Sequence, residues 1–214
     1  MELTGEKFVK ALQRHDAVVR MGDIFALAKT YSSMDSSDIR RLLHNPKHEV
    51  RVGAVSIMDF QARDKKTSAE RRGELYELYM NNHAHIDSWS MVDRVAPYVV
   101  GGYLWDKSRE PLYELARSAQ PMERRTAIVA TYYFIRQHDL EDTFRIGEIL
   151  AHDPDDLVQK AVGGWVREAG KQDPDRLREY LDEFAATMPR TALRYAVEHL
   201  DADERQHYLG LKDS

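Results

Sequence analysis

The chain repeats one short pattern four times, and few architectures are compatible with such a repeat. Each copy places a turn-forming stretch before a helical segment in which a basic residue is followed by small and branched apolar residues; the copies are NPKHEVRVGAV, QPMERRTAIVA, DPDDLVQKAVG and TMPRTALRYAV. Alignment of their basic residues gives spacings of 74, 35 and 34 residues, for Arg51, Arg125, Lys160 and Arg194. The first spacing is two periods of about 37 residues, which is typical of helix pairs that bury their apolar faces only by stacking on neighbours. We therefore predict an all-α helical-repeat solenoid.

Apolar residues recur three and four positions apart along nearly the whole sequence, and strand-like alternation is scarce. Helices are predicted at 21-31, 36-44, 47-62, 68-81, 88-94, 97-105, 109-118, 121-136, 139-151, 154-169, 173-185, 189-199 and 202-208. The residues that mark helix ends include the possible caps at 35-37, the Asp-Pro pairs at 153-154 and 173-174, and Gly170. Because the connections are short, neighbouring helices should pack antiparallel in a single domain spanning residues 1-214.

The composition favours a helical, water-soluble chain. Hydrophobic residues make up 43% and charged residues 31%, with 7 Pro and 11 Gly. The longest apolar runs, such as 95-100 and 127-130, are too short to cross a bilayer, and the first residues lack the apolar core of a secretory signal. With no cysteine in the sequence, we expect a cytoplasmic protein without disulfides.

The formal net charge of -5 argues against a surface that binds nucleic acid everywhere, although it permits a basic groove on an acidic body. The four repeated basic residues would line one side of a superhelix, which predicts a concave basic groove. The alternative is that each of them neutralises an acidic group of the next repeat.

Trp89 and Asp93 stand four residues apart in the segment 85-97, so a helix would place them on one face. An aromatic ring beside a carboxylate could stabilise a sugar that carries a positive charge. The alternative is a core tryptophan and an aspartate that pairs with Arg94 or another arginine.

Several long motifs resemble those of the AlkD-type DNA alkylation repair enzymes. IDSWSMVDRVAP resembles the N-x-W-D-x-V-D-x-x-A-P stretch of that family, and LARSAQPMERRTAIVATYYFIR resembles its L-A-R-S-x-x-x-W-E-R-R-x-A-I-V-A-T-x-x-F-I-R helix. DDLVQKAVGGWVREAGKQDP and FAATMPRTALRYAVEHL resemble its two C-terminal motifs, and HNPKHEVRVGAV matches an earlier repeat. The resemblance runs from about Asp23 to Leu209.

This resemblance implies a HEAT-like repeat fold and a monofunctional DNA glycosylase that hydrolyses the N-glycosidic bond of cationic N3- or N7-alkylated purines in duplex DNA. It assigns the catalytic carboxylate to Asp93 and an aromatic contact with the lesion backbone to Trp89. The residues expected to bind DNA are Arg124, Arg125, Lys160, Trp165, Arg194 and Arg51. No metal, organic cofactor or membrane is implied, and a monomer is expected because a lesion has no two-fold symmetry.

The sequence departs from the family pattern at Gly164, where the second aromatic residue is expected, and Trp165 is displaced from that position by one residue, about 100° of helix rotation. Met122 and Ser90 also replace expected residues, and the segment before the resemblance is short. The alternative function is a non-catalytic HEAT-repeat module that binds nucleic acid or protein through its concave face. The pair His83 and His85 lacks further nearby ligands, so a metal site is not predicted.

Overall fold

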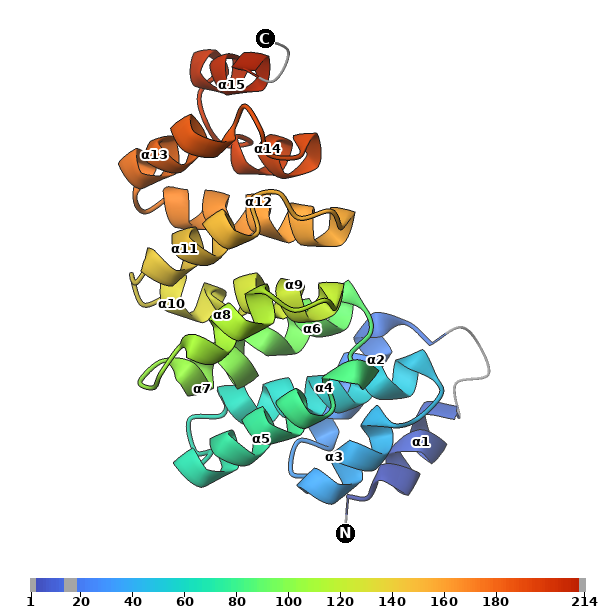
Figure 1. The fold of residues 1–214 in the computed structure, drawn as a ribbon. Helices are drawn as coiled ribbons and strands as arrows, with labels where there is room; N and C mark the ends of the chain where they lie inside the picture. Colours follow the sequence, from blue (N-terminus) through green and yellow to red (C-terminus); the bar gives the residue numbers. More distant parts are fainter. Residues whose placement is uncertain (1–2, 14–18, 212–214) are drawn as a thin grey trace. The chain divides into compact units, whose positions relative to one another are not determined.

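A computed structural model describes residues 3–13 and 19–211, and within these ranges every regular element is helical (Figure 1). The predicted all-α class is therefore confirmed. The chain divides into two compact units, Met1–Tyr103 and Leu104–Ser214. A single domain over the whole length stays a prediction.

Unit 1 is built from successive helix pairs whose first and second helices form separate layers. The first-helix layer contains α1 (Gly5–Gln13), α3 (Ser36–Leu43) and α5 (Ala69–Asn81), and the second-helix layer contains α2 (Met21–Thr30), α4 (His48–Arg63) and α6 (Trp89–Ala96). A short 3₁₀ turn, η1 (His83–His85), leads into α6. The centre of this unit is α4, which packs on α2, α3 and α6 and is buried along most of its length.

The end of α6 differs from the prediction of two helices at 88-94 and 97-105. The structure has one nearly continuous helical path, in which α6 passes through a π segment, η2 (Pro97–Gly101), into α7 (Gly102–Leu104). The amide of Gly102 donates to the carbonyl oxygen of Pro97, five residues back. Pro97 has no amide hydrogen and therefore breaks the α-helical hydrogen-bond ladder without ending the helix.

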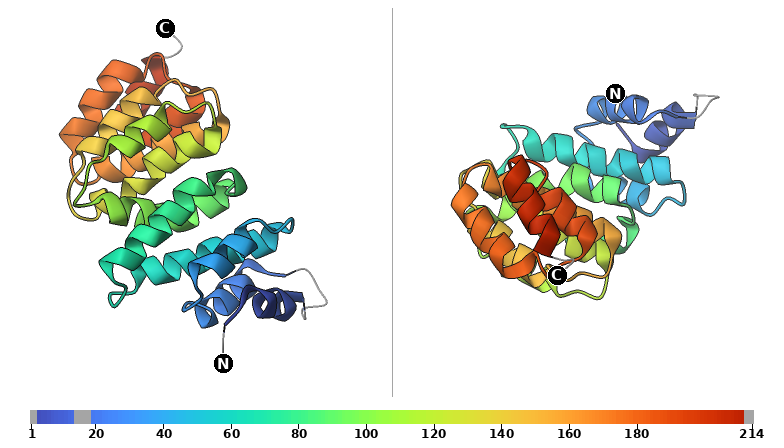
Figure 2. Two further views of the ribbon diagram at one scale, coloured as in Figure 1. Left: turned by 60° about the horizontal axis from the view of Figure 1, so that its bottom comes forward. Right: turned by 90° about the horizontal axis from the view of Figure 1, so that it is seen from above.

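Unit 2 has the same two-layer construction (Figures 1 and 2). Its first-helix layer contains α8 (Glu110–Ala116), α11 (Glu141–Ile149) and α13 (Pro174–Phe184), and its second-helix layer contains α9 (Pro121–Ala130), α12 (Asp156–Gly170) and α14 (Arg190–Ala196). The short α10 (Tyr132–Ile135) follows α9, and α15 (Ala202–Gly210) follows α14. The predicted helix 121-136 is interrupted at Thr131, whose hydroxyl donates to the Ile128 carbonyl oxygen at 2.7 Å.

Some helix ends follow the predicted signals and others do not. The side chains of Asp35 and Asp173 accept amide hydrogen bonds at the starts of α3 and α13, and Pro174 is the first residue of α13. The prediction that Pro154 begins a helix was wrong, because α12 (Asp156–Gly170) starts two residues later, with Asp155 as its N-cap. Gly170 ends α12 as predicted, and a β-carbon there would lie 2.5 Å from a methyl group of Leu177.

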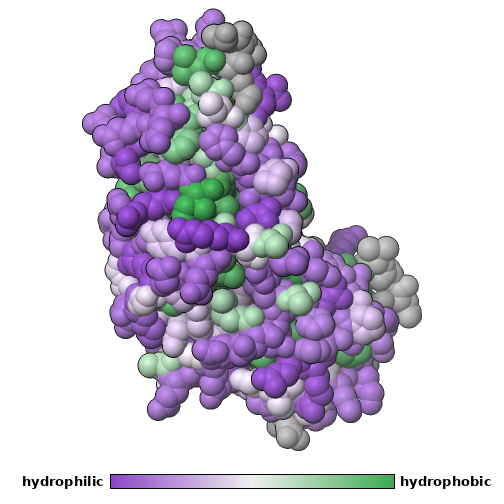
Figure 3. All heavy atoms as spheres, viewed as in Figure 1, coloured by the Kyte–Doolittle hydropathy of each residue, from purple (hydrophilic) through white to green (hydrophobic). Residues whose placement is uncertain are grey.

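Hydrophilic side chains cover most of the face drawn in Figure 3, and hydrophobic residues appear there in small patches. Among the described residues, none of the helices combines the length and hydrophobicity needed to cross a membrane.

Candidate functional site

The α6 helix carries both Trp89 and Asp93, as their spacing predicts. Ser88 is the N-cap with an extended backbone, so Trp89 is the first helical residue and its side chain is 51% exposed. Asp93 follows one turn later and is half-buried. The two side chains therefore lie on one face of a helix whose opposite face is in the core. Their catalytic role stays a prediction.

A buried carboxylate on α4 fixes the position of α6. Asp59 is fully buried and accepts from Arg63 Nε at 2.7 Å, and the Arg94 Nη2 atom of α6 lies 3.1 Å from its other oxygen. Arg94 also lies over the rings of Phe25 and Phe60, with 4.6 and 4.9 Å to their centroids. Burial raises the pKa of Asp59, while the two guanidinium groups act against that rise.

Arg51 connects α4 to the start of α6. Its Nη2 atom donates to both carboxylate oxygens of Asp87, at 3.0 and 2.8 Å, and Nη1 donates to the carbonyl oxygens of Asn45 and Pro46. Because Asp87 directly precedes the N-cap of α6, this arginine joins one repeat to the next.

Arg124 makes the same set of contacts in unit 2. It donates to both oxygens of Asp153, at 2.6 and 3.0 Å, and to the carbonyl oxygens of Ser118 and Ala119. Asp153 is nearly inaccessible, and its hydrogen bond raises the pKa of Arg124. For Arg51 and Arg124 the structure therefore has the acidic partners in the next repeat that the alternative interpretation expected.

These contacts correct the predicted register of the repeats. Arg51 and Arg124 are both the fourth residue after the N-cap of their helix, and Gln159, at that position in α12, donates to the Asp153 carbonyl oxygen at 2.9 Å. Arg125, Lys160 and Arg194 are each the fifth residue after an N-cap. Only these three share an equivalent position. Because Arg124 and Arg125 are neighbours, either of them can be aligned with Arg51 in the sequence. The alignment with Arg125 put Arg51 one residue out of register.

The three equivalent basic residues have different surroundings. Arg125 is buried and donates to the Leu157 carbonyl oxygen in the first turn of α12. Lys160 pairs with Asp156 at 2.6 Å, which raises the pKa of Lys160 and, with a hydrogen bond from Thr191, lowers that of Asp156. Arg194 is exposed and forms no ion pair within residues 3–13 and 19–211. The basic groove predicted from these residues stays a prediction.

The two glycines of α12 have opposite surroundings. A β-carbon on Gly163 would lie 2.2 Å from the Ala192 carbonyl oxygen, so this glycine permits α14 to approach closely. A β-carbon on Gly164 would have no atom within 4 Å. The position of the missing aromatic is therefore open, whereas Trp165 is half-buried and packs on Tyr132 with ring centroids 5.0 Å apart.

The histidines of η1 belong to the packing of unit 1. The ring of His83 packs edge-on against Tyr79, and the ring of His85 lies 4.0 Å from that of His44. In the described part of the chain, no three or more His, Cys, Asp or Glu side chains form a group that could hold a metal ion.

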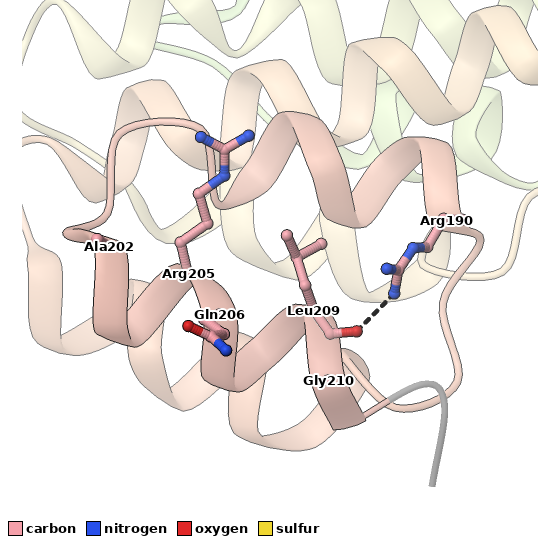
Figure 4. Close-up of a pocket in the computed structure, with 6 residues that line it drawn as sticks. All are labelled: Arg190, Ala202, Arg205, Gln206, Leu209 and Gly210. Atoms are coloured by element: carbon pink, nitrogen blue, oxygen red, sulfur yellow. Dashed lines mark hydrogen bonds between the residues drawn. The ribbon is translucent and has the colours of Figure 1, made fainter.

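A shallow hollow lies between the start of α14 and α15 (Figure 4). Its lining residues are Arg190, Ala202, Arg205, Gln206, Leu209 and Gly210. Arg190 crosses it to donate to the Leu209 carbonyl oxygen at 2.6 Å, so this guanidinium joins α14 to α15. None of the predicted site residues lines this hollow.

Two solved structures have a similar fold. They are AlkD2 from Streptococcus mutans, with 18% identity and a TM-score of 0.62 over 93% of this chain and 100% of that one, and smu.31 from Streptococcus mutans UA159, with 17% identity and a TM-score of 0.62 over 92% and 99%. The predicted helical-repeat fold is thereby confirmed. No curated protein sequence matches the chain. The DNA alkylation repair enzyme family matches residues 7–200. This protein therefore belongs to the DNA alkylation repair enzyme family.

Proposed function

We propose that this protein is a monofunctional DNA glycosylase that hydrolyses the N-glycosidic bond of cationic N3- or N7-alkylated purines in duplex DNA. The observation that carries the proposal is the arrangement of α6, where the exposed Trp89 and the carboxylate of Asp93 share one face. The membership of the repair family supports the same activity.

The chemistry follows from the charge of the substrate. An alkylated purine already carries a positive charge, so the electron pair of the breaking C1′–N bond neutralises the departing base without prior protonation. The deoxyribose becomes oxocarbenium-like, and the Asp93 carboxylate stabilises this charge and orients the water that forms the new C1′–O bond. That water loses its proton to the carboxylate or to solvent. The products are the free base and an abasic site.

The remaining residues serve to position the DNA. Trp89 packs against the lesion backbone through its exposed ring, and Lys160 and Arg194 contact phosphates. Arg125 is buried and donates to the Leu157 carbonyl oxygen, so its part is to hold α9 against α12. Arg51 and Arg124 are engaged by Asp87 and Asp153, so we assign them mainly to the connection between repeats. The enzyme acts as a monomer.

The test is release of free base from duplex DNA that contains N7-methylguanine, measured under single-turnover conditions against spontaneous depurination. We expect release by the wild type and a loss of at least a hundredfold in Asp93→Asn, because the neutral amide no longer stabilises the cationic sugar. Binding to the same duplex should change less than twofold. Asp203→Asn, on the exposed surface of α15, is the matched control and should release base at the wild-type rate.

Two outcomes would contradict the proposal. Unchanged release by Asp93→Asn would remove the role assigned to this carboxylate. Absence of release by the wild type, with salt-sensitive DNA binding retained, would favour the alternative function, a non-catalytic repeat module that binds DNA.

A further inference from the structure

We propose that Tyr195 is a DNA-contacting aromatic residue that supplies, from α14, the ring that is missing at Gly164. The inference rests on the proposed function and adds a positioning residue to it. Tyr195 and Trp89 are the two aromatic side chains with high exposure in the described ranges, at 40% and 51%.

The position of Tyr195 is fixed by the close packing of two helices. A β-carbon on Gly163 would lie 2.7 Å from that of Tyr195. The backbone of α14 therefore lies directly on α12, and the tyrosine ring extends from this contact toward solvent. Its hydroxyl has no hydrogen-bond partner among the described residues, so the side chain is not held by the protein at its outer end.

Two basic residues, Lys160 and Arg194, accompany Tyr195 on this pair of helices. Thr191 donates to Asp156 at 3.1 Å where the two helices begin. Lys160 follows Asp156 by four residues on α12, and Tyr195 follows Thr191 by four residues on α14, so both side chains lie one turn beyond this contact. After the larger effect of Asp156, the proximity of Tyr195 also raises the pKa of Lys160. Arg194, the residue before Tyr195, is exposed.

This arrangement suits one class of ligand. An exposed aromatic ring stacks on a base or packs against a sugar, while a lysine and an arginine beside it neutralise the adjacent phosphates. The tyrosine hydroxyl can also donate to a phosphate oxygen. The open space at Gly164, on the same helix face as Lys160 and one turn away, leaves room for the strand beside the ring.

The experiment compares Tyr195→Ala with Tyr195→Phe and with Ile149→Ala. Ile149 is a large hydrophobic residue that is 38% exposed, but it lies on α11 in the first-helix layer, so it is the matched control. We expect Tyr195→Ala to weaken binding to an undamaged duplex about tenfold, within the range measured for one stacked base. Tyr195→Phe should lose less than threefold, and Ile149→Ala should bind like the wild type. Fluorescence anisotropy with a labelled duplex measures all four affinities.

A second substitution tests whether Tyr195 replaces the missing aromatic. Gly164→Trp in the Tyr195→Ala protein should restore most of the affinity, because the new side chain enters open space on the same pair of helices. Equal binding by Tyr195→Ala and the wild type would overturn the inference, as would an equal loss in Ile149→Ala. These binding measurements use undamaged DNA, so failure of base release would refute the glycosylase without refuting the role of Tyr195.

Discussion

The adjacent glycines of α12 should respond in opposite ways to the same added methyl group. Gly163→Ala places a β-carbon against the backbone carbonyl of Ala192, which cannot move without shifting α14, so we expect a loss of about 1–3 kcal/mol in the free energy of unfolding. Gly164→Ala enters open space and removes the entropic cost of glycine within a helix, so we expect a gain of about 0.5–1 kcal/mol. Urea unfolding followed by circular dichroism measures both, each variant serving as the control for the other.

A destabilised Gly164→Ala protein would contradict this assignment of the two positions. The sequence alone identified the pair as a departure from the family pattern, but it could not distinguish the glycine required by packing from the one that leaves a gap. That distinction depends on Ala192, which lies about thirty residues further along the chain. Nothing in the sequence distinguishes Tyr195 from the other tyrosines, because its exposure depends on how α14 packs against α12.

The arginines that join successive repeats provide a second matched comparison, at the scale of elements. Asp153→Ala leaves the guanidinium of Arg124 without its buried partner and removes the acceptor for the Asp155 amide, so we expect a loss of about 3–5 kcal/mol. Asp87→Ala breaks the corresponding pair with Arg51, but this carboxylate is 52% exposed, and the expected loss is below about 1 kcal/mol. Equal losses in the two variants, measured by thermal or urea unfolding, would show that burial does not determine the strength of these pairs.

Most helices could be predicted from periodicity and capping signals, because those signals are local. The four-fold repeat and its approximate period were also accessible. The register was not, because Arg124 and Arg125 fit the alignment equally well until the contacts of Arg124 with Ser118 and Asp153 are known. The Asp59–Arg94 pair was missed for a related reason: nothing in the sequence indicates that a single aspartate inside α4 is completely buried.

At the scale of the whole molecule, acid should weaken the fold. Hydrogen bonds lower the folded-state pKa of Asp35, which accepts from the Asp38 amide, of Glu74, which accepts from Arg71, and of Asp156, which accepts from Lys160. Stability contributed by these groups is present above their unfolded pKa values of 3.8 to 4.5 and is lost as the pH falls through the folded values. We therefore expect the urea midpoint to fall as the pH decreases from 5 to 2.5.

Asp59 acts in the opposite direction, since burial raises its pKa. Its contribution is present below its unfolded pKa of 3.8 and is lost as the pH rises through the folded value. One carboxylate with a raised pKa should not reverse the effect of the several carboxylates whose pKa values are lowered. Asp35→Asn, which keeps a capping side chain without a titrating group, should lose less stability on acidification than the wild type. A urea midpoint that rises as the pH falls to 2.5 would contradict the expectation that acid destabilises the fold.

The π segment that follows α6 affects how this protein should be aligned with its relatives. Each hydrogen-bonded loop of a π-helix contains one residue more than a loop of an α-helix. A relative with an uninterrupted α-helix at Pro97–Gly101 would therefore span the same path with one residue fewer. An alignment without a gap would then shift every downstream position by one. Transfer of residue roles from one member to another across this segment thus requires a single-residue gap placed within it.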